Sequence, residues 1–493
     1  MPIDRMRRVQ AAMRRALDVL GIAAMLALAA CASTPPSPPT MDLPPGDAAN
    51  VVAPDWWLAF HDPQLVAIVS EALANNLDLK LAIARVDEAR GLAAIVRAEL
   101  FPTLDLNARV GRSKISSTNG TVLPPDTSLI TNSFAVGISA AYELDLWGKV
   151  RSGVNAAEQD LLASQFARDT VRIAVAAETT RNYFMLRAID AQLGVLRDTL
   201  ATRDETVKLQ RDRYEGGVIG EFELSQAQAE RATVAADMAT TERAQHLLEA
   251  ALTVLAGRSP RGVFAADVAR DQASMVSPVA LPTVPAGLPS DLLAQRPDVR
   301  AAEARLAAAD YHISEARAQY FPDISLTGSF GGASAALGDL LLAPARVWSI
   351  AAALAQPIFR AGQITALVDT ARARREQALL GYQQTVLTAF REAHDAFVSA
   401  DTSRRALAAQ SERRDAIAKA LDLARDRYQA GYSPFLEVLD AQRNLLAAER
   451  ARIDAARDLQ TAIVDVYRAL GGGWQAAPEA TVTSDVKSAQ QRL

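Results

Sequence analysis

The motif Arg97-Ala98-Glu99-Leu100-Phe101-Pro102 occurs twice in this chain, returning 220 residues later as Arg317-Ala318-Gln319-Tyr320-Phe321-Pro322. A second motif, Arg211-Asp212-Arg213-Tyr214, returns 214 residues later as Arg425-Asp426-Arg427-Tyr428. Repeat distances this long indicate duplication of a whole structural unit and not a short-period solenoid. We therefore predict two structural repeats, over 62–257 and 289–470, joined by a linker at 258–288.

Each repeat is predicted to contain a helix, two strands, a long helix, a tight break and a further helix. The helical segments are rich in Ala, Leu, Arg and Glu, which favour helix formation. No proline occurs within 126–259 or within 358–433, so long uninterrupted helices are permitted there. The first long helix is predicted over about 148–214, on the order of 100 Å at 1.5 Å per residue. Helices of about half that length are predicted at 63–99 and 221–256.

Alternating polar and apolar residues lie between the helices of each repeat. In 104–110 the even positions are apolar and the odd positions polar, the period of a strand with two different faces. The same alternation marks 133–145, 324–330 and 348–354. Such runs approach the length of a transmembrane strand with one wet and one lipid face, although a soluble sheet with one buried face has the same pattern. Because open sheet edges are excluded in lipid, four membrane strands would require several copies of the chain.

The first residues have the form of a secretory signal peptide over 1–30, with a basic start and an apolar run at 16–30. That run ends at Cys31, the only cysteine, so the fold holds without an intramolecular disulfide. Leu28-Ala29-Ala30-Cys31 resembles a bacterial lipobox, which implies cleavage before Cys31 and a lipid on its sulfur. An ordinary small-residue cleavage site is the alternative. The resemblance also favours the outer membrane, because Ala32 is not the Asp associated with inner-membrane retention.

Composition argues against several classes of function. A net charge of −5 and a pI near 5.6 argue against a nucleic-acid partner. The four histidines are scattered without metal-ligand spacing, and no phosphate-binding loop or nucleophile elbow is present. We expect no enzyme activity and no cofactor apart from the lipid on Cys31.

Three motifs resemble NodT-type outer-membrane efflux lipoproteins, a group of the TolC-like outer-membrane factors. They are Pro54-Asp55-Trp56-Trp57, Tyr142-Glu143-Leu144-Asp145-Leu146-Trp147-Gly148-Lys149-Val150-Arg151 and Gln295-Arg296-Pro297-Asp298-Val299-Arg300-Ala301-Ala302-Glu303. The resemblance implies a mixed, mainly α fold and a trimer, whose twelve-stranded transmembrane β-barrel sits on a long periplasmic α-helical barrel. An equatorial girdle would then come from the lipidated tether 31–61, the linker 258–288 and the C-terminal tail 471–493.

The same resemblance implies a passive exit duct of a tripartite efflux pump, which carries small molecules across the outer membrane. Its partners would be outer-membrane lipid, a periplasmic adaptor and an inner-membrane transporter, RND-type by resemblance. The same duct in a type I protein-secretion system is the alternative, because the sequence does not name the inner-membrane partner. A periplasmic coiled-coil adaptor would also be Ala-rich and helical, but it has no need for two-faced strands.

The resemblance also assigns roles around the two breaks between paired helices. Glu437 and Asp440 match acidic rings that narrow the periplasmic aperture, and their spacing places them on one helix face. Glu223 and Tyr428 match a latch, although the chain has Ser433 where TolC carries Arg, so the latch differs in detail. For these carboxylates a solvated helix surface is the alternative. The tips that would dock the adaptor are Gly217, Val218, Ile219, Gly220, Gly431, Tyr432, Ser433 and Pro434.

Overall fold

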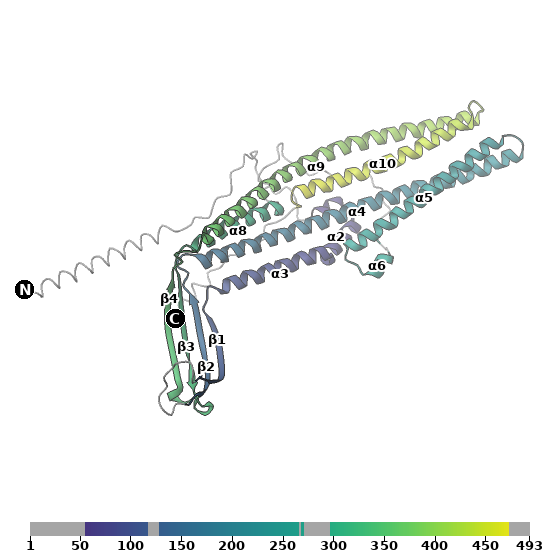
Figure 1. Ribbon diagram of the computed structural model, residues 1–493. Coiled ribbons are helices and arrows are strands. Elements are labelled where there is room, and N and C mark those ends of the chain that lie inside the picture. Colours follow the sequence, from purple (N-terminus) through teal and green to yellow (C-terminus); the bar gives the residue numbers. More distant parts are fainter. Residues whose placement is uncertain (1–54, 117–127, 266–267, 271–295, 473–493) are drawn as a thin grey trace, which may run out of the picture. The chain divides into compact units, whose positions relative to one another are not determined.

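The computed structural model describes residues 55–116, 128–265, 268–270 and 296–472 (Figure 1). The predicted signal peptide, Cys31, most of the tether and most of the linker lie outside the described residues. So does the tail beyond residue 472.

The described residues form the predicted duplicated architecture. The first copy comprises the 3-10 helix η1 (Trp56–Phe60), α2 (Pro63–Asn75), α3 (Leu77–Ala98), β1 (Thr103–Lys114), β2 (Ile130–Glu143), α4 (Lys149–Glu215) and α5 (Glu221–Leu255), followed by the short α6 (Pro260–Ala265). The second comprises α8 (Pro297–Ala318), β3 (Asp323–Ser334), the 3-10 turns η2 (Leu337–Asp339) and η3 (Ala343–Ala345), β4 (Arg346–Ala355), α9 (Gln363–Gln429) and α10 (Phe435–Ala469). Corresponding helices have equal lengths: 22 residues in α3 and α8, 67 in α4 and α9, and 35 in α5 and α10.

The helix predicted over 63–99 is interrupted at Asn76, so the prediction of one continuous helix is wrong. Asn76 has an extended ψ of 133°, and its side-chain oxygen accepts a hydrogen bond from the N–H of Leu79 at 3.0 Å. Its side-chain nitrogen donates to the carbonyl oxygen of Leu255 at 3.0 Å. Asn is a favoured helix N-cap, and here it both starts α3 and ties the break to the end of α5.

The helices pack side by side, with α4 in contact with α2, α3, α5, α8 and α10, and with α9 in contact with α8 and α10 (Figure 1). The main hydrophobic core lies where η1 and α2 pack on α4 and α10. The ring of Trp56 stacks on that of Tyr467 with centroids 5.1 Å apart, and the ring of Phe60 lies 4.9 Å from that of Phe184. Aromatic pairs of this kind add to the stabilisation from buried area.

The four predicted strands are confirmed, and they form one antiparallel sheet in the order β1-β2-β3-β4. The register aligns an apolar row across the sheet, Leu106, Ile138, Phe330 and Trp348. The next row, on the other face, is Asp105, Ser139, Ser329 and Ser349. Leu106 is 77% exposed and Trp348 72% exposed, so the chain by itself leaves large apolar side chains of this face in contact with solvent.

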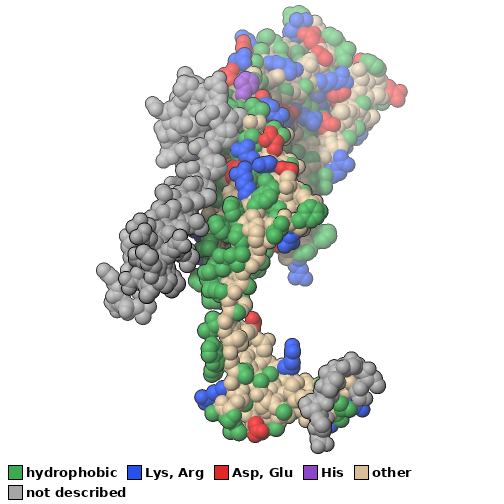
Figure 2. Space-filling model, turned by 60° about the vertical axis from the view of Figure 1, so that its left-hand side comes forward, with side chains coloured by type: hydrophobic (Ala, Val, Ile, Leu, Met, Phe, Trp, Pro, Cys, Tyr) green, Lys and Arg blue, Asp and Glu red, His purple; other side chains and the backbone are tan. Residues whose placement is uncertain are grey.

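Charged side chains are unevenly distributed over the molecule. Figure 2 shows Lys, Arg, Asp and Glu densely spread over the helical part and sparse over the strands. Many of the helix charges form exposed pairs one turn apart, such as Asp369 with Arg372 and Asp401 with Arg405, which are typical of a water-facing helix surface. In the part of the chain that the structure describes, no helix is both long enough and apolar enough to span a membrane.

Two glycines allow strands β2 and β3 to approach closely. A Cβ atom on Gly331 would lie 2.2 Å from the carbonyl oxygen of Val136 and 2.6 Å from the Cα of Gly137. These are backbone atoms, which cannot move aside without breaking the ladder of hydrogen bonds. We expect Gly331→Val to disrupt the sheet and to reduce the yield of folded, protease-resistant protein at least several-fold, as measured on gels. Gly338→Val is the control, because a Cβ there meets nothing within 4 Å and the yield should not change.

Candidate functional site

The two breaks between paired helices have the same backbone structure. Gly217 follows α4 with φ +70°, and Gly431 follows α9 with φ +78°. In both copies the N–H of this glycine and that of the next residue donate to carbonyl oxygens in the last helical turn, at 2.8–3.0 Å. This Schellman arrangement needs a residue with positive φ, which glycine adopts without strain. The predicted tight breaks are therefore built as sharp, ordered turns.

Most of the predicted tip residues are accessible. Gly217, Val218, Gly220, Gly431, Tyr432 and Pro434 are exposed, whereas Ile219 and Ser433 are partly buried. Val218 is 74% exposed and Tyr432 81% exposed, and the nearby Phe222 and Leu436 also expose apolar side chains. Each turn therefore presents an apolar surface to solvent.

The two predicted aperture carboxylates lie at the start of α10, next to the second turn. The carboxylate of Glu437 lies 3.5 Å from Nε of Arg427, at the end of α9. Asp440 is exposed, and its carboxylate accepts a hydrogen bond from the side chain of Asn444 at 3.1 Å. The structure thus adds Arg427, a cation that sequence reasoning did not place beside Glu437.

Tyr428, one of the two predicted latch residues, has other partners within the chain. The guanidinium of Arg213, on α4, donates to the phenol oxygen of Tyr428 and lies 5.6 Å from its ring centroid. The Tyr428 ring also lies 5.6 Å from that of Phe435. Among the described residues, no hydrogen bond joins Glu223 to Tyr428. Arg213 belongs to the repeated Arg-Asp-Arg-Tyr motif, so the sequence marked it as a residue of interest. The motif alone does not show that its side chain faces Tyr428 of the other hairpin.

A row of polar contacts joins α4 of the first helical hairpin (α4 and α5) to α10 of the second (α9 and α10). Arg181, Gln192 and Arg203 lie eleven residues apart, about three turns of helix, so they share one face of α4. Their partners on α10 are Asp465, Asp454 and Gln442. Contacts between α5 and α10 add Glu230 with Arg443 and Asp237 with Arg450. The seam between the two hairpins is therefore largely polar.

The stretch 142–151 forms the corner between β2 and α4. The carboxylate of Asp145 accepts hydrogen bonds from the N–H groups of Val150 and Arg151 at 3.2 and 2.9 Å. A carboxylate at a helix N-terminus stabilises the exposed N–H groups and the helix dipole. Trp147 stacks on Phe321 with centroids 4.9 Å apart and donates to the carbonyl oxygen of Pro322 at 2.8 Å. The corner of the first copy is thus fixed to the repeated Phe-Pro motif of the second.

Comparison with known proteins agrees with this geometry. A family model described as outer membrane efflux protein matches residues 68–258 and 288–472. The chain belongs to the outer membrane efflux protein family.

Relatives of this family match over most of their length. The solvent efflux pump outer membrane protein SrpC of Pseudomonas putida is 36% identical over 422 residues, 84% of this chain and 86% of SrpC. The pyoverdine export outer membrane protein OpmQ of Pseudomonas aeruginosa is 32% identical, over 94% of this chain and 98% of OpmQ. The crystal structure of the Campylobacter jejuni CmeC outer membrane channel superimposes with a TM-score of 0.82 at 26% identity, covering 92% of this chain and 97% of CmeC.

Membership of the outer membrane efflux protein family confirms three of the predictions. The chain has the fold of the TolC-like channels, it lies in the outer membrane and extends into the periplasm, and it is the outer-membrane component of an efflux pump. Its relatives are channel and transport proteins and not enzymes. The names of the relatives favour efflux over the alternative of type I protein secretion.

Proposed function

We propose that three copies of this chain assemble into the exit duct, with their sheets joined into one closed wall of twelve strands across the outer membrane. One observation carries the closed wall of strands: the four-stranded sheet has an exposed apolar face and two open edges. The number of three copies is taken from the TolC-like channels that the chain resembles. In the described part of the chain, β1 and β4 each pair with one neighbour only. An open edge and an uncovered apolar face are unfavourable for an isolated chain, and joining β4 of one copy to β1 of the next removes both edges.

Strand length and the nature of each face support this assignment. The strands contain 12, 14, 12 and 10 residues, at or above the 9–11 residues that a tilted transmembrane strand needs. The apolar row around Leu106 and Trp348 would face lipid, and the row around Asp105 and Ser349 a wet lumen. A polar lumen passes solutes without tight binding, so we propose passive conduction. Small organic molecules are the proposed cargo, because the relatives SrpC and OpmQ are named for solvent efflux and pyoverdine export.

The partners of the duct follow from its two ends. We assign the exposed apolar turns, Gly217 to Gly220 and Gly431 to Pro434, to docking of a periplasmic adaptor that belongs to an RND-type inner-membrane transporter. A lipid on Cys31 would add an anchor in the outer membrane, because an acyl chain gains free energy for each buried methylene.

Engineered cysteines test the closed wall of strands. We expect one cysteine in β1 (at Asp105, Asn107 or Arg109) and one in β4 (at Ser349 or Ala351) to give disulfide-linked trimers in at least one combination. All five positions lie on the polar face, and residues opposite each other on adjacent strands are within disulfide distance. Oxidised and reduced membranes would be compared on non-reducing gels.

A control pair inside the chain separates this outcome from random oxidation. Ser139 and Ser329 are partners in adjacent strands β2 and β3, so Ser139→Cys/Ser329→Cys should oxidise within one chain and yield only monomers. If no β1–β4 combination gives trimers while the control pair oxidises fully, the proposed assembly is wrong.

A further inference from the structure

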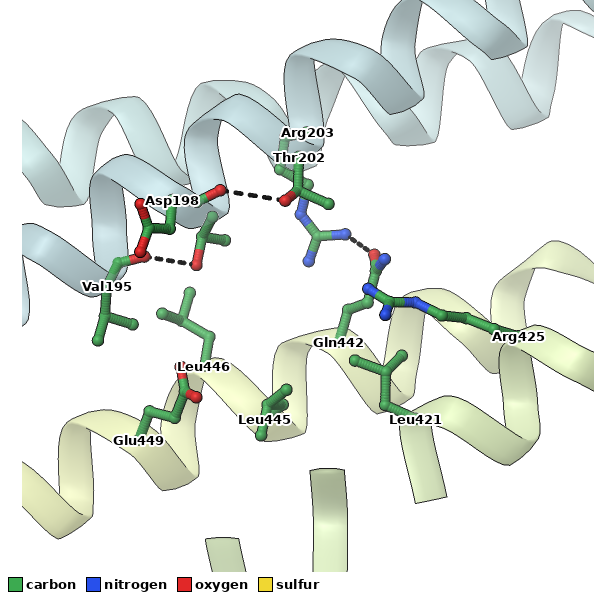
Figure 3. A pocket seen from close by; sticks show the side chains of 11 residues that line it. Val195, Asp198, Thr202, Arg203, Leu421, Arg425, Gln442, Leu445, Leu446 and Glu449 are labelled. Carbon is green, nitrogen blue, oxygen red and sulfur yellow. Dashed lines mark hydrogen bonds between the residues drawn. The ribbon is translucent and has the colours of Figure 1, made fainter. Parts of the chain in front are cut away.

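A cavity lies in the seam between the two helical hairpins, a few helical turns from the breaks at Gly217 and Gly431. It has a volume of about 260 Å³ and lies between α4 on one side and α9 and α10 on the other (Figure 3). One water takes about 30 Å³ of liquid volume, so the cavity has room for a small ion together with water. Its lining includes Asp198, Arg203, Arg425, Gln442 and Glu449.

Arg203 is the unusual residue of this cavity. Its side chain is only 2% exposed, and a guanidinium stays charged in proteins. One terminal nitrogen donates to the side-chain oxygen of Gln442, another lies 4.0 Å from the carboxylate of Glu230, and Nε has no hydrogen-bond partner among the described residues. A buried cation with an unused donor is costly unless another partner is present.

Two further guanidinium groups lie near Arg203, from both helices of the second hairpin. Burial lowers the pKa of Arg203, and the positive charges of Arg443 and Arg425 lower it further, whereas Glu230 acts in the opposite direction. Figure 3 shows the head groups of Arg203 and Arg425 both directed toward Gln442. Three cations from both hairpins therefore converge on one place in the seam.

The nearby carboxylates neutralise only part of this cluster. Glu230 is engaged by Arg443, and Glu449 accepts a hydrogen bond from Arg414 at 3.3 Å. Asp198 is exposed to water and lies toward the other end of the cavity in Figure 3. The nearest carboxylate oxygen of Asp422 is 3.9 Å from Arg425, in an exposed pair that is screened by solvent. Glu230 and Asp440 therefore offset the charge of Arg443. Arg203 and Arg425 are left without a carboxylate within hydrogen-bond distance among the described residues, because Glu230 is 4.0 Å from Arg203 and Asp422 is 3.9 Å from Arg425.

We propose that this cavity binds a small oxyanion, an inorganic phosphate or a carboxylate, between the guanidinium groups of Arg203 and Arg425. Guanidinium groups bind such anions with paired, charge-assisted hydrogen bonds. The bound anion touches α4 of the first hairpin and α9 of the second, so it holds the two hairpins together. A ligand that binds only the closed seam shifts the population toward that state. This site is separate from the aperture carboxylates and does not depend on conduction.

Calorimetric titration of the purified, detergent-solubilised protein tests the site. Sodium phosphate and sodium acetate would be titrated separately at constant ionic strength, with sodium chloride as the blank. We expect saturable binding of at least one anion, with Kd raised at least tenfold in Arg425→Gln. Arg405→Gln is the matched control. Arg405 is also on α9, but it is 71% exposed and pairs with Asp401 one turn away, so the Kd of this variant should equal that of wild type.

Each outcome decides one part of the proposal. Binding of phosphate alone assigns an inorganic oxyanion, and binding of acetate alone assigns a carboxylate. No saturable binding of either anion, or an equal Kd in wild type and Arg425→Gln, overturns the site. Hydrogen exchange then tests the bridging role: amides of α10 around Gln442 should exchange more slowly with the anion bound. Binding without this protection overturns the bridge.

Discussion

Asp62→Ala is expected to lower the free energy of unfolding by about 3 kcal/mol, one of the two largest effects that the structure indicates. One carboxylate oxygen accepts hydrogen bonds from the N–H groups of Gln64 and Leu65 at 2.9 and 3.1 Å, which caps α2. The other accepts from the phenol of Tyr183 at 2.7 Å and from the guanidinium of Arg187 at 3.0 Å. Loss of a cap costs about 1 kcal/mol, and loss of buried hydrogen bonds to a charged group about 1.5–3 kcal/mol.

The surroundings of Asp62 explain why water cannot replace the lost carboxylate. Tyr183 and Arg187 are buried on α4 beneath the aromatic core of η1. Burial raises the pKa of Tyr183, and the hydrogen bond to Asp62 raises it further, so the phenol remains a donor at any working pH. Removing the Asp62 carboxylate leaves the buried hydroxyl of Tyr183 without the acceptor of its hydrogen bond. The loss should loosen η1, the first described element of the chain.

Unfolding of the detergent-solubilised protein in denaturant would measure the effect. Asp62→Asn should lose less, because the amide oxygen still caps α2 while the charge is gone. Asp87→Ala is the control: Asp87 is 62% exposed and pairs with Arg90 one turn away, and exposed pairs contribute 0–1 kcal/mol. A loss below about 1 kcal/mol in Asp62→Ala would show that the N-terminal segment is held by its aromatic residues alone.

The long elements could be predicted from the sequence because their signals are spread over many residues. The 67-residue helices α4 and α9 follow from two proline-free, Ala-rich segments, and the strands follow from alternation that repeats in both copies. The break at Asn76 could not be predicted in the same way. Asn is tolerated inside helices, and the contact that ties the Asn76 side chain to the end of α5, its hydrogen bond to the carbonyl of Leu255, is to a residue 179 positions away.

The site could be predicted only in part, for a similar reason. Glycines at the turns need positive φ and therefore stand out in the sequence. The polar seam does not: Gln192 and Arg203 lie on a helix that is polar on several sides, where such residues usually face water. These residues are buried because α10 packs against them. The 11-residue spacing places them on one face of α4, but the sequence does not show that α10 covers that face. Arg427 was missed because its partner Glu437 lies across a turn, on the next helix.

Arg427 leads to the second large effect, on ion selectivity at the aperture. Glu437, Asp440 and Arg427 together carry a net charge of −1 per chain at neutral pH, and the nearby Arg443, which also attracts Asp440, is paired with Glu230. Three copies therefore place a ring of negative charge at the proposed entrance. Such a ring favours cations. We expect wild-type channels to be cation-selective, and Glu437→Gln or Asp440→Asn alone to be nearly unselective, because either change brings the net charge to zero. The cation-to-anion permeability ratio should fall by about threefold or more, as charge rings control selectivity in narrow pores.

The double variant Glu437→Gln/Asp440→Asn gives the sharper result. It leaves Arg427 uncompensated, so the net charge becomes +1 per chain and the channel should prefer anions. Adding Arg427→Gln should remove that preference. Reversal potentials in planar bilayers under a salt gradient would measure all four variants, with Asp369→Asn as control, because Asp369 is an exposed carboxylate paired with Arg372 near the other end of α9. If the double variant stays as cation-selective as wild type, the selectivity arises elsewhere in the duct, and these carboxylates are solvated residues of the helix surface.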